Sequence, residues 1–350
     1  MDHSESIPSP PTLGTAELRP PKSRFNPNPP VSTPPNRLWL HGLLFGLTFI
    51  SATLPFSTPV PGEGALDALL FGPLQDPIRM VDGLRFSVPL LAILLAHEMG
   101  HYLTARVYGV NQSLPFFIPA PGTYFGTMGA VIIMRSQPPS RPALLNVAVM
   151  GPYAGVILAI PASAWGLANS TPIEPEALTG TSIIFGSSLL FQFLESVFSP
   201  NGTDVLIHPV GLAGWVGLFI TSLNLIPAGQ LDGGHVAYSI LGKSHKLFSR
   251  IVVFSLFALA LYLGAEGTIW IVWAILLSFF GLHHPPVSNE SIPLSRGQKL
   301  NALLALVLLI ATFTPTPMKI LSPEMETSPK EQTYQEANPP KPIEDFKLQQ

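Results

Sequence analysis

Long apolar stretches recur along this chain, separated by shorter and more polar segments. They lie near residues 38–54, 86–108, 143–168, 210–241, 250–264, 268–282 and 300–314. About 20 mostly apolar helical residues cross the hydrocarbon core of a bilayer, and several of these stretches are short for a full crossing. The pattern therefore predicts an all-α polytopic membrane protein with about six or seven transmembrane helices.

Both ends of the chain lack this pattern. Residues 1–37 hold several proline pairs, such as Pro10-Pro11 and Pro34-Pro35, which are typical of a disordered or polyproline tail. Residues 315–350 are also polar and rich in proline. We therefore expect three parts: a disordered Pro-rich cytoplasmic tail over 1–37, a membrane-embedded domain over 38–314 and a disordered polar tail over 315–350.

Two internal segments are not typical of transmembrane helices. Segment 181–198 is amphipathic, so we expect it to lie flat in the membrane interface. Segment 123–134 contains glycine and β-branched residues and follows several prolines. It predicts a short membrane-associated β segment, either a strand or a hairpin, whose edge pairs with an unwound partner segment. An ordinary loop packed against the helices is the alternative.

The composition supports a membrane location and excludes several other classes of protein. Charged residues make up 11% of the chain, against roughly a quarter in soluble domains, and the mean hydropathy is +0.38. The net charge of −3 gives no strong field for nucleic acid. With 0 cysteines, the chain has no disulfides, thiolate metal sites or cysteine nucleophiles.

The distribution of Lys and Arg predicts the orientation. Segment 169–209 has neither residue. Basic residues instead follow the second and fourth apolar stretches and precede the last: Arg135, Arg141, Lys243, Lys246, Arg250, Arg296 and Lys299. Because cytoplasmic loops carry an excess of Lys and Arg, we expect a cytoplasmic N-terminus, with 169–209 on the opposite side.

Three ionisable side chains, His97, Glu98 and His101, lie within the apolar stretch 86–108. Such groups are costly inside a membrane, so their presence indicates a function. His97 and His101 are four residues apart and share a helix face, where both imidazoles reach one ion. Glu98 lies beside that face and is placed to accept a proton from water. H-E-x-x-H is the helical signature of zinc hydrolases; a buried polar network in a transporter is the alternative.

A catalytic zinc ion takes three protein ligands and keeps one position open. Asp232 is the suitable group in another membrane segment, and prolines and glycines around it interrupt the helix: Pro227, Gly229, Gly233 and Gly234. Such a break lets the carboxylate turn toward a metal. His235 is the rival ligand. A broken helix that binds a cation directly, as in secondary transporters, is the other interpretation.

Longer motifs surround these residues. H-E-x-G-H at His97–His101 is followed by the A-x-x-x-G of Ala105 and Gly109, G-P-x-A-G occupies Gly151–Gly155, and N-x-x-P-x-x-x-L-D-G runs from Asn224 to Gly233. With these motifs the chain resembles the site-2 protease family of intramembrane zinc metalloproteases. Segment 115–135 and the His-Pro-Pro of His284–Pro286 resemble bacterial and plastid-type members, so the likeness covers about 86–286.

The resemblance implies a role for each site residue. His97, His101 and Asp232 are implied as ligands of one Zn²⁺ per chain, Glu98 as the general base and Asn224 as a polar group near the substrate carbonyl. Domain 38–314 is then a metalloprotease domain in a lipid bilayer, which cuts a transmembrane helix of a membrane-protein substrate in regulated intramembrane proteolysis. No insertion of about ninety soluble residues interrupts the core, so we expect a minimal form without a PDZ domain.

Two other functions compete with this one. A cation transporter would use the His/His/Asp cluster as an ion site but would need no base beside the first ligand. An inactive scaffold that binds membrane helices is less favoured, because each metal position is intact. The resemblance and the acidic residues in the first segment, which a transit peptide lacks, favour a bacterial cytoplasmic membrane.

Overall fold

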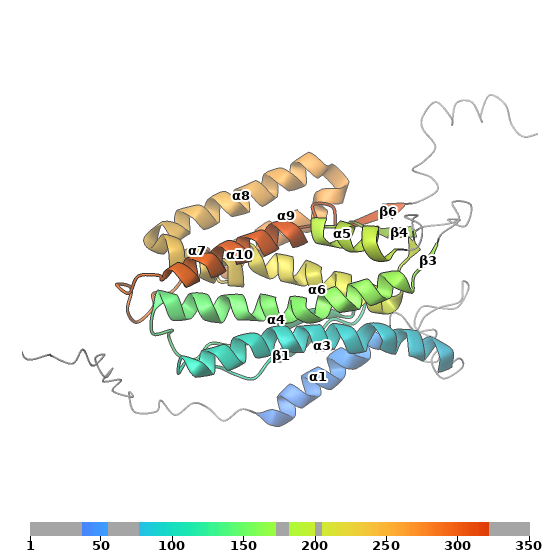
Figure 1. Ribbon diagram of the computed structural model, residues 1–350, viewed down its shortest axis with the longest axis horizontal. Coiled ribbons are helices and arrows are strands. Elements are labelled where there is room, and N and C mark those ends of the chain that lie inside the picture. The colour runs from blue at the N-terminus through green and yellow to red at the C-terminus, as the bar shows by residue number, and fades with distance from the viewer. Residues whose placement is uncertain (1–36, 55–76, 173–181, 200–204, 322–350) are drawn as a thin grey trace, which may run out of the picture. The chain divides into compact units, whose positions relative to one another are not determined.

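The computed structural model describes residues 37–54, 77–172, 182–199 and 205–321. These residues are mostly helical, with three short two-stranded sheets (Figure 1). The α-helices are α1 (Leu38–Thr53), α3 (Pro77–Val107), α4 (Arg141–Ala168), α5 (Leu189–Phe198), α6 (Pro209–Leu225), α7 (Asp232–Leu241), α8 (His245–Leu263), α9 (Thr268–Phe280) and α10 (Arg296–Thr312). The strands are β1 (Phe116–Pro119), β2 (Thr127–Val131), β3 (Thr171–Pro172), β4 (Ser182–Phe185), β5 (Val205–Leu206) and β6 (Met318–Leu321).

The described residues contain 3 helical stretches long and apolar enough to cross a membrane: Met80–Val107, Arg141–Ala168 and Asp232–Phe279. The last combines α7, α8 and α9 with the short 3-10 turns between them. Three further apolar helices, α1, α5 and α6, are shorter. The prediction of a largely helical chain with apolar helices is confirmed, whereas the count of six or seven transmembrane helices stays a prediction.

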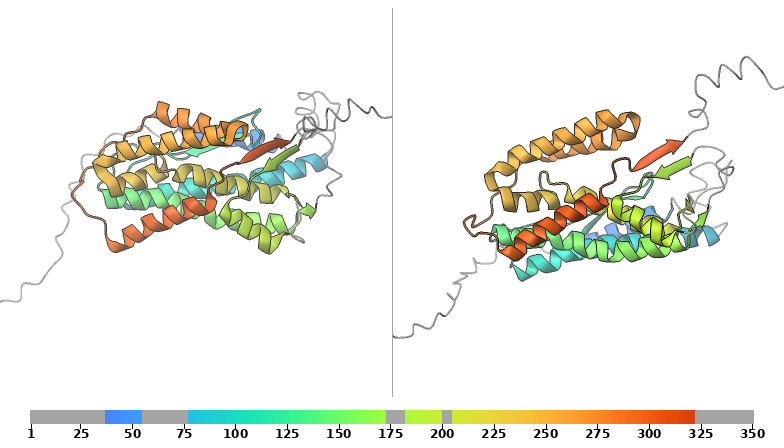
Figure 2. Two further views of the ribbon diagram at one scale, coloured as in Figure 1. Left: turned by 90° about the horizontal axis from the view of Figure 1, so that it is seen from above. Right: turned by 45° about the horizontal axis from the view of Figure 1, so that its top comes forward.

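Helices α3, α4 and α6 pack closely against one another, and Figure 1 shows α3 and α4 side by side along their lengths. Glycines permit this approach. A Cβ atom on Gly166 of α4 would overlap the backbone of Gly211 in α6, and one on Gly214 would overlap Ser163 of α4. Small residues at such crossings are a common means of packing helices in membranes. Helices α8 and α9 form a separate antiparallel pair, visible as its own layer in Figure 2.

The apolar stretch 210–241 is interrupted, as its prolines and glycines predict. Helix α6 ends at Leu225, Gly229 has a φ of 59°, and α7 begins at Asp232. The non-helical backbone between α6 and α7 is held by α8, because the Gly229 N–H donates to Ser249 Oγ at 3.2 Å. Ser249 in turn lies 3.2 Å from Nε2 of the buried His245. Away from water, irregular backbone needs such partners.

Strands β1 and β2 form an antiparallel hairpin, which confirms the β segment predicted within 123–134. Phe116 pairs with Val131 and Phe117 with Ala130. The hairpin contacts α1 through β1, and β2 contacts α3. In the described part of the chain, β2 has no strand partner other than β1.

One expectation stays a prediction and another needs correction in the region of β4 and β6. In segment 181–198, β4 precedes α5, whose 10 residues begin after the N-cap Ser188, and its position flat in the membrane interface stays a prediction. The tail 315–350 does not start as a disordered segment, because Met318–Leu321 forms β6 and pairs with β4. The partner strand lies more than a hundred residues away, which local sequence does not reveal. The predicted tails over 1–36 and 322–350 lie outside the described residues.

The crossing of α4 and α6 gives a test of the packing. We expect Gly166→Ala to lower the free energy of unfolding by about 1–3 kcal/mol, because the new methyl group meets rigid backbone. The control is Gly42→Ala in α1, where nothing lies within 4 Å of the added Cβ. Alanine is the better helix former, so this change leaves stability equal or higher. Thermal unfolding in detergent measures the stability of both variants. Equal effects on stability would contradict the close packing of α4 against α6.

Candidate metal centre

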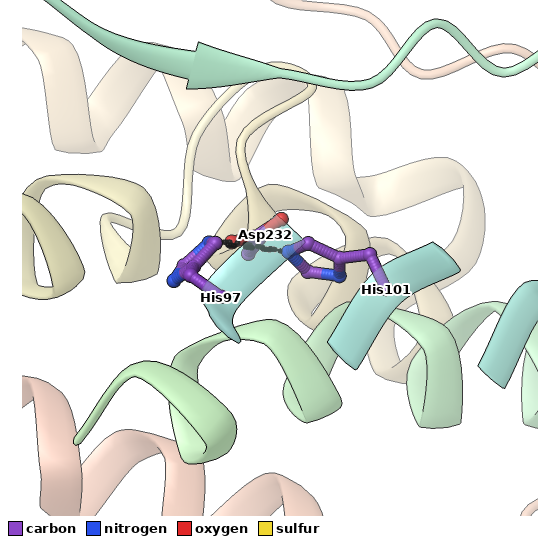
Figure 3. Close-up of side chains that lie close together, drawn as sticks. All are labelled: His97, His101 and Asp232. Atoms are coloured by element: carbon purple, nitrogen blue, oxygen red, sulfur yellow. Dashed lines mark hydrogen bonds and ion pairs between the residues drawn. The ribbon is translucent and has the colours of Figure 1, made fainter. Parts of the chain in front are cut away.

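Two helices bring three candidate metal ligands together. His97 and His101 lie one turn apart in α3, and Asp232 is the first residue of α7. The Asp232 Oδ2 atom lies 3.2 Å from Nε2 of His97 and 3.2 Å from Nε2 of His101. The two Nε2 atoms are also 3.2 Å apart. Figure 3 shows the three side chains converging on one point.

This triangle fits a tetrahedral zinc ion. Bonds of about 2.0–2.1 Å in a tetrahedron set the ligand atoms about 3.3 Å apart. His101 Nδ1 donates to the Val147 carbonyl oxygen at 2.8 Å, so in the neutral ring Nε2 presents a lone pair to Asp232. A lone pair facing a carboxylate oxygen at 3.2 Å is repulsive unless a cation lies between them. The donor set of two imidazoles and one carboxylate suits zinc.

Helix α4 supplies the wall behind both imidazoles. A Cβ atom on Gly151 would overlap the His101 ring, and one on Gly155 would lie 3.3 Å from Nδ1 of His97. From the α3 side of the contact between α3 and α4, a Cβ atom on Gly100 would overlap the Met150 carbonyl group of α4. The glycines of the Gly151–Gly155 motif therefore give the imidazoles room.

The two predicted catalytic residues also lie at this centre. Glu98 follows His97 in α3 and is buried, with 5% of its surface exposed. Asn224 is in the last turn of α6, just before the break, and its Nδ2 lies 3.2 Å from His97 Nε2. The structure thus brings together all five residues named from the sequence, which come from α3, α6 and α7.

His235, the rival ligand, takes part in a different cluster. Its Nδ1 lies 2.6 Å from His284 Nε2, and the His284 ring stacks on Tyr238 with centroids 4.1 Å apart. Burial lowers the pKa of His284 to about 4, so this ring is neutral and accepts the hydrogen bond from His235. The described metal-ligand group contains Asp232 and not His235. In the sequence, only the His-Pro-Pro motif drew attention to His284.

Residues 85–263, half of the chain, match the family model described as Peptidase family M50. The chain belongs to peptidase family M50. The resemblance to the site-2 proteases is therefore confirmed, and the match spans both segments that form the candidate metal centre.

Several plant proteins are similar to this M50 chain. The probable zinc metalloprotease EGY1, chloroplastic, of Arabidopsis thaliana is 30% identical over 64% of this chain and 41% of its own length. The protein with the same name from Oryza sativa subsp. japonica is 28% identical over 70% of this chain and 43% of its own length. The probable zinc metalloprotease EGY2, chloroplastic, of Arabidopsis thaliana is 29% identical over 69% of this chain and 42% of its own length.

The M50 chain thus spans about two fifths of the length of these relatives. No solved structure matches it. The family and the relatives' names support a zinc metalloprotease, and the His-His-Asp group fits zinc binding.

The glycine wall gives a prediction about the metal. Gly151→Ala places a methyl group where the His101 ring lies, so we expect zinc affinity to fall about 10–100-fold, as for other disturbed metal-ligand supports. Gly46→Ala in α1, where the added Cβ meets nothing within 4 Å, is the matched control and keeps full affinity. Competition with a fluorescent chelator measures the zinc affinity of both variants. Unchanged affinity in Gly151→Ala would show that the imidazoles do not hold the ion.

The choice between Asp232 and His235 gives a second prediction. We expect Asp232→Asn to lose zinc from the purified protein, because the anionic ligand is removed. We expect His235→Asn to keep about one zinc ion per chain. Elemental analysis after dialysis measures both proteins. The reverse pattern would make His235 the third ligand.

Proposed function

We propose that this chain is an intramembrane zinc endopeptidase, which hydrolyses a peptide bond in or near a transmembrane segment of another membrane protein. The observation that carries the proposal is the 3.2 Å triangle of His97, His101 and Asp232 beside the buried Glu98, on helices apolar enough for a membrane. Membership of a peptidase family supports hydrolysis. The cation transporter is not favoured, because it gives Glu98 no task.

The proposed roles follow from the positions of the residues. His97, His101 and Asp232 hold one Zn²⁺, and a zinc ion there supplies a Lewis acid that acidifies water and polarises a carbonyl group. Glu98 takes the proton from the attacking water and passes it to the amine of the leaving peptide. Its buried position excludes bulk water, which would otherwise compete for that proton.

Asn224 is proposed to bind the substrate carbonyl. Its amide Nδ2 lies 3.2 Å from His97 Nε2, so its N–H donors are within reach of an oxygen beside the ligands. Donors that meet the developing oxyanion lower the barrier, and losing one typically costs a hundredfold or more in rate.

The substrate must be unwound before it is cut, since the amides of a helix are closed in i→i−4 hydrogen bonds. The proposed docking edge is β2, which packs against the ligand-bearing α3 and has β1 as its strand partner in the described residues. Side chains along β2 are apolar and accessible, with Met128 69% and Val131 46% exposed. An extended segment added to β2 would present its carbonyls in a row.

The proposed location is an integral position in a membrane, with the N-terminus in the cytoplasm. The apolar helices and the family support the integral position. The bacterial cytoplasmic membrane stays a prediction, and the relatives EGY1 and EGY2 are named as chloroplastic. Regulated proteolysis of a signalling substrate belongs to the same proposal.

Glu98→Gln tests the proposal. The probe is a co-expressed single-pass membrane protein that carries a tag at each end and a glycine-containing transmembrane segment. We expect the parent chain to cut it, and Glu98→Gln to cut it at least ~100-fold more slowly, because the proton acceptor is gone. Zinc stays bound, since Glu98 is not a ligand.

The matched control is Asp82→Asn, another loss of one carboxylate from α3, at an exposed ion pair with Arg85. We expect it to cut at the parent rate. Parent-like cleavage by Glu98→Gln, or cleavage by zinc-free parent protein, would contradict the proposed mechanism.

A further inference from the structure

A cavity lies beside α7 and is not lined by the candidate metal ligands. It has a volume of about 720 Å³ and is enclosed mainly by α7, α10, the end of α6 and the first turn of α4. None of the five proposed site residues lines it. Its walls are apolar, as Val236, Ile240, Ala302, Leu306 and Leu309 illustrate.

The α7 residues of this cavity do not include the candidate metal ligand. They are Gly233, Val236, Ala237, Ser239, Ile240 and Leu241. Asp232, whose carboxylate meets the imidazoles, does not line the cavity. The cavity is therefore a separate feature of the same helix.

The charged residues of the cavity are both positive. Arg141 and Lys299 line it, and no Asp or Glu does. The Arg141 Nε atom is buried and has no hydrogen-bond partner. Among the described residues, neither cation forms an ion pair. A buried guanidinium N–H without an acceptor is costly, so the site calls for an anion.

Two helix ends increase this positive potential. Arg141 is the first residue of α4, and Lys299 lies near the start of α10, which begins at Arg296. Neither helix has an acidic residue in its first turn. Cations at helix N-termini are unfavourable because the helix dipole is positive there, and an anion between them removes the conflict.

We propose that this cavity binds an anionic phospholipid of the surrounding membrane. The phosphate lies between Arg141 and Lys299, and acyl chains fill the apolar space between α7 and α10. Both cations belong to segments that the Lys/Arg distribution assigns to the cytoplasmic side, where basic pockets between helices bind lipid headgroups. The site does not depend on the proposed proteolytic function.

The lining of the cavity favours a lipid over other occupants. A free phosphate ion would leave the apolar walls unfilled. A lipid uses both the cations and the apolar space.

Native mass spectrometry of the full chain in a neutral detergent tests the proposal. Phosphatidylglycerol and phosphatidylcholine with the same acyl chains are titrated separately. We expect tight binding of phosphatidylglycerol to the parent, at a stoichiometry of one. The double variant Arg141→Gln/Lys299→Gln should bind it about 30-fold more weakly, since each cation near the surface contributes roughly fivefold.

Two further variants separate charge from shape. Lys246→Gln/Arg250→Gln removes two exposed cations of α8 on the same predicted side, outside the cavity, and should keep parent affinity. Ala302→Phe fills the apolar part, keeps both cations and should weaken binding.

Four results would overturn the proposal. Equal affinities for phosphatidylglycerol and phosphatidylcholine would show that the site does not require an anionic lipid. Equal losses of affinity in Arg141→Gln/Lys299→Gln and Lys246→Gln/Arg250→Gln would show that overall charge, and not the cavity, determines binding. Full competition by inorganic phosphate would identify a free-anion site. Crosslinking of the tagged membrane probe from Leu303 in the cavity would identify a peptide site instead.

Discussion

Charged and polar groups held away from water need partners, and this constraint shapes the centre of the molecule. Three ligand atoms 3.2 Å apart, two of them imidazole nitrogens and one a carboxylate oxygen, need a positive charge between them, from a metal ion or a proton. The same constraint governs the backbone between α6 and α7, where Ser249 accepts the hydrogen bond of Gly229. The broken helix that presents Asp232 is thus held by α8, and α8 becomes part of the support of the site.

Much of the centre was predictable because its information is local. The four-residue spacing of His97 and His101 sets one helix face, whatever the rest of the fold does. Pro227 and Gly229 lie close together and favour a helix break before Asp232, whereas the isolated Pro89 and Pro161 lie inside α3 and α4. His101 and Asp232 are 131 residues apart, so their contact is not local. It was predictable because few other groups in the apolar stretches can ligate a metal.

Features that depend on distant partners were not predictable. The contacts of His284 with His235 and Tyr238 were not predictable, because both residues are 46 or more positions away in the sequence. They become neighbours only when the segment after α9 folds back. Strand β6 needs β4 as its partner, and each strand has only 4 residues, which is too short to be recognised alone. The cavity between α7 and α10 likewise arises from packing, which leaves Arg141 without the acceptor that its burial requires.

X-ray absorption at the zinc edge tests the central claim most directly, because it reports the ligands around the ion in the full chain reconstituted in lipid. The account predicts a single zinc environment with four nitrogen and oxygen neighbours near 2.0–2.1 Å, two of them imidazoles, and one position held by water. Asp232→Asn should abolish this spectrum. A shell of six oxygens, a site without two imidazoles, or an unchanged spectrum in Asp232→Asn would contradict it.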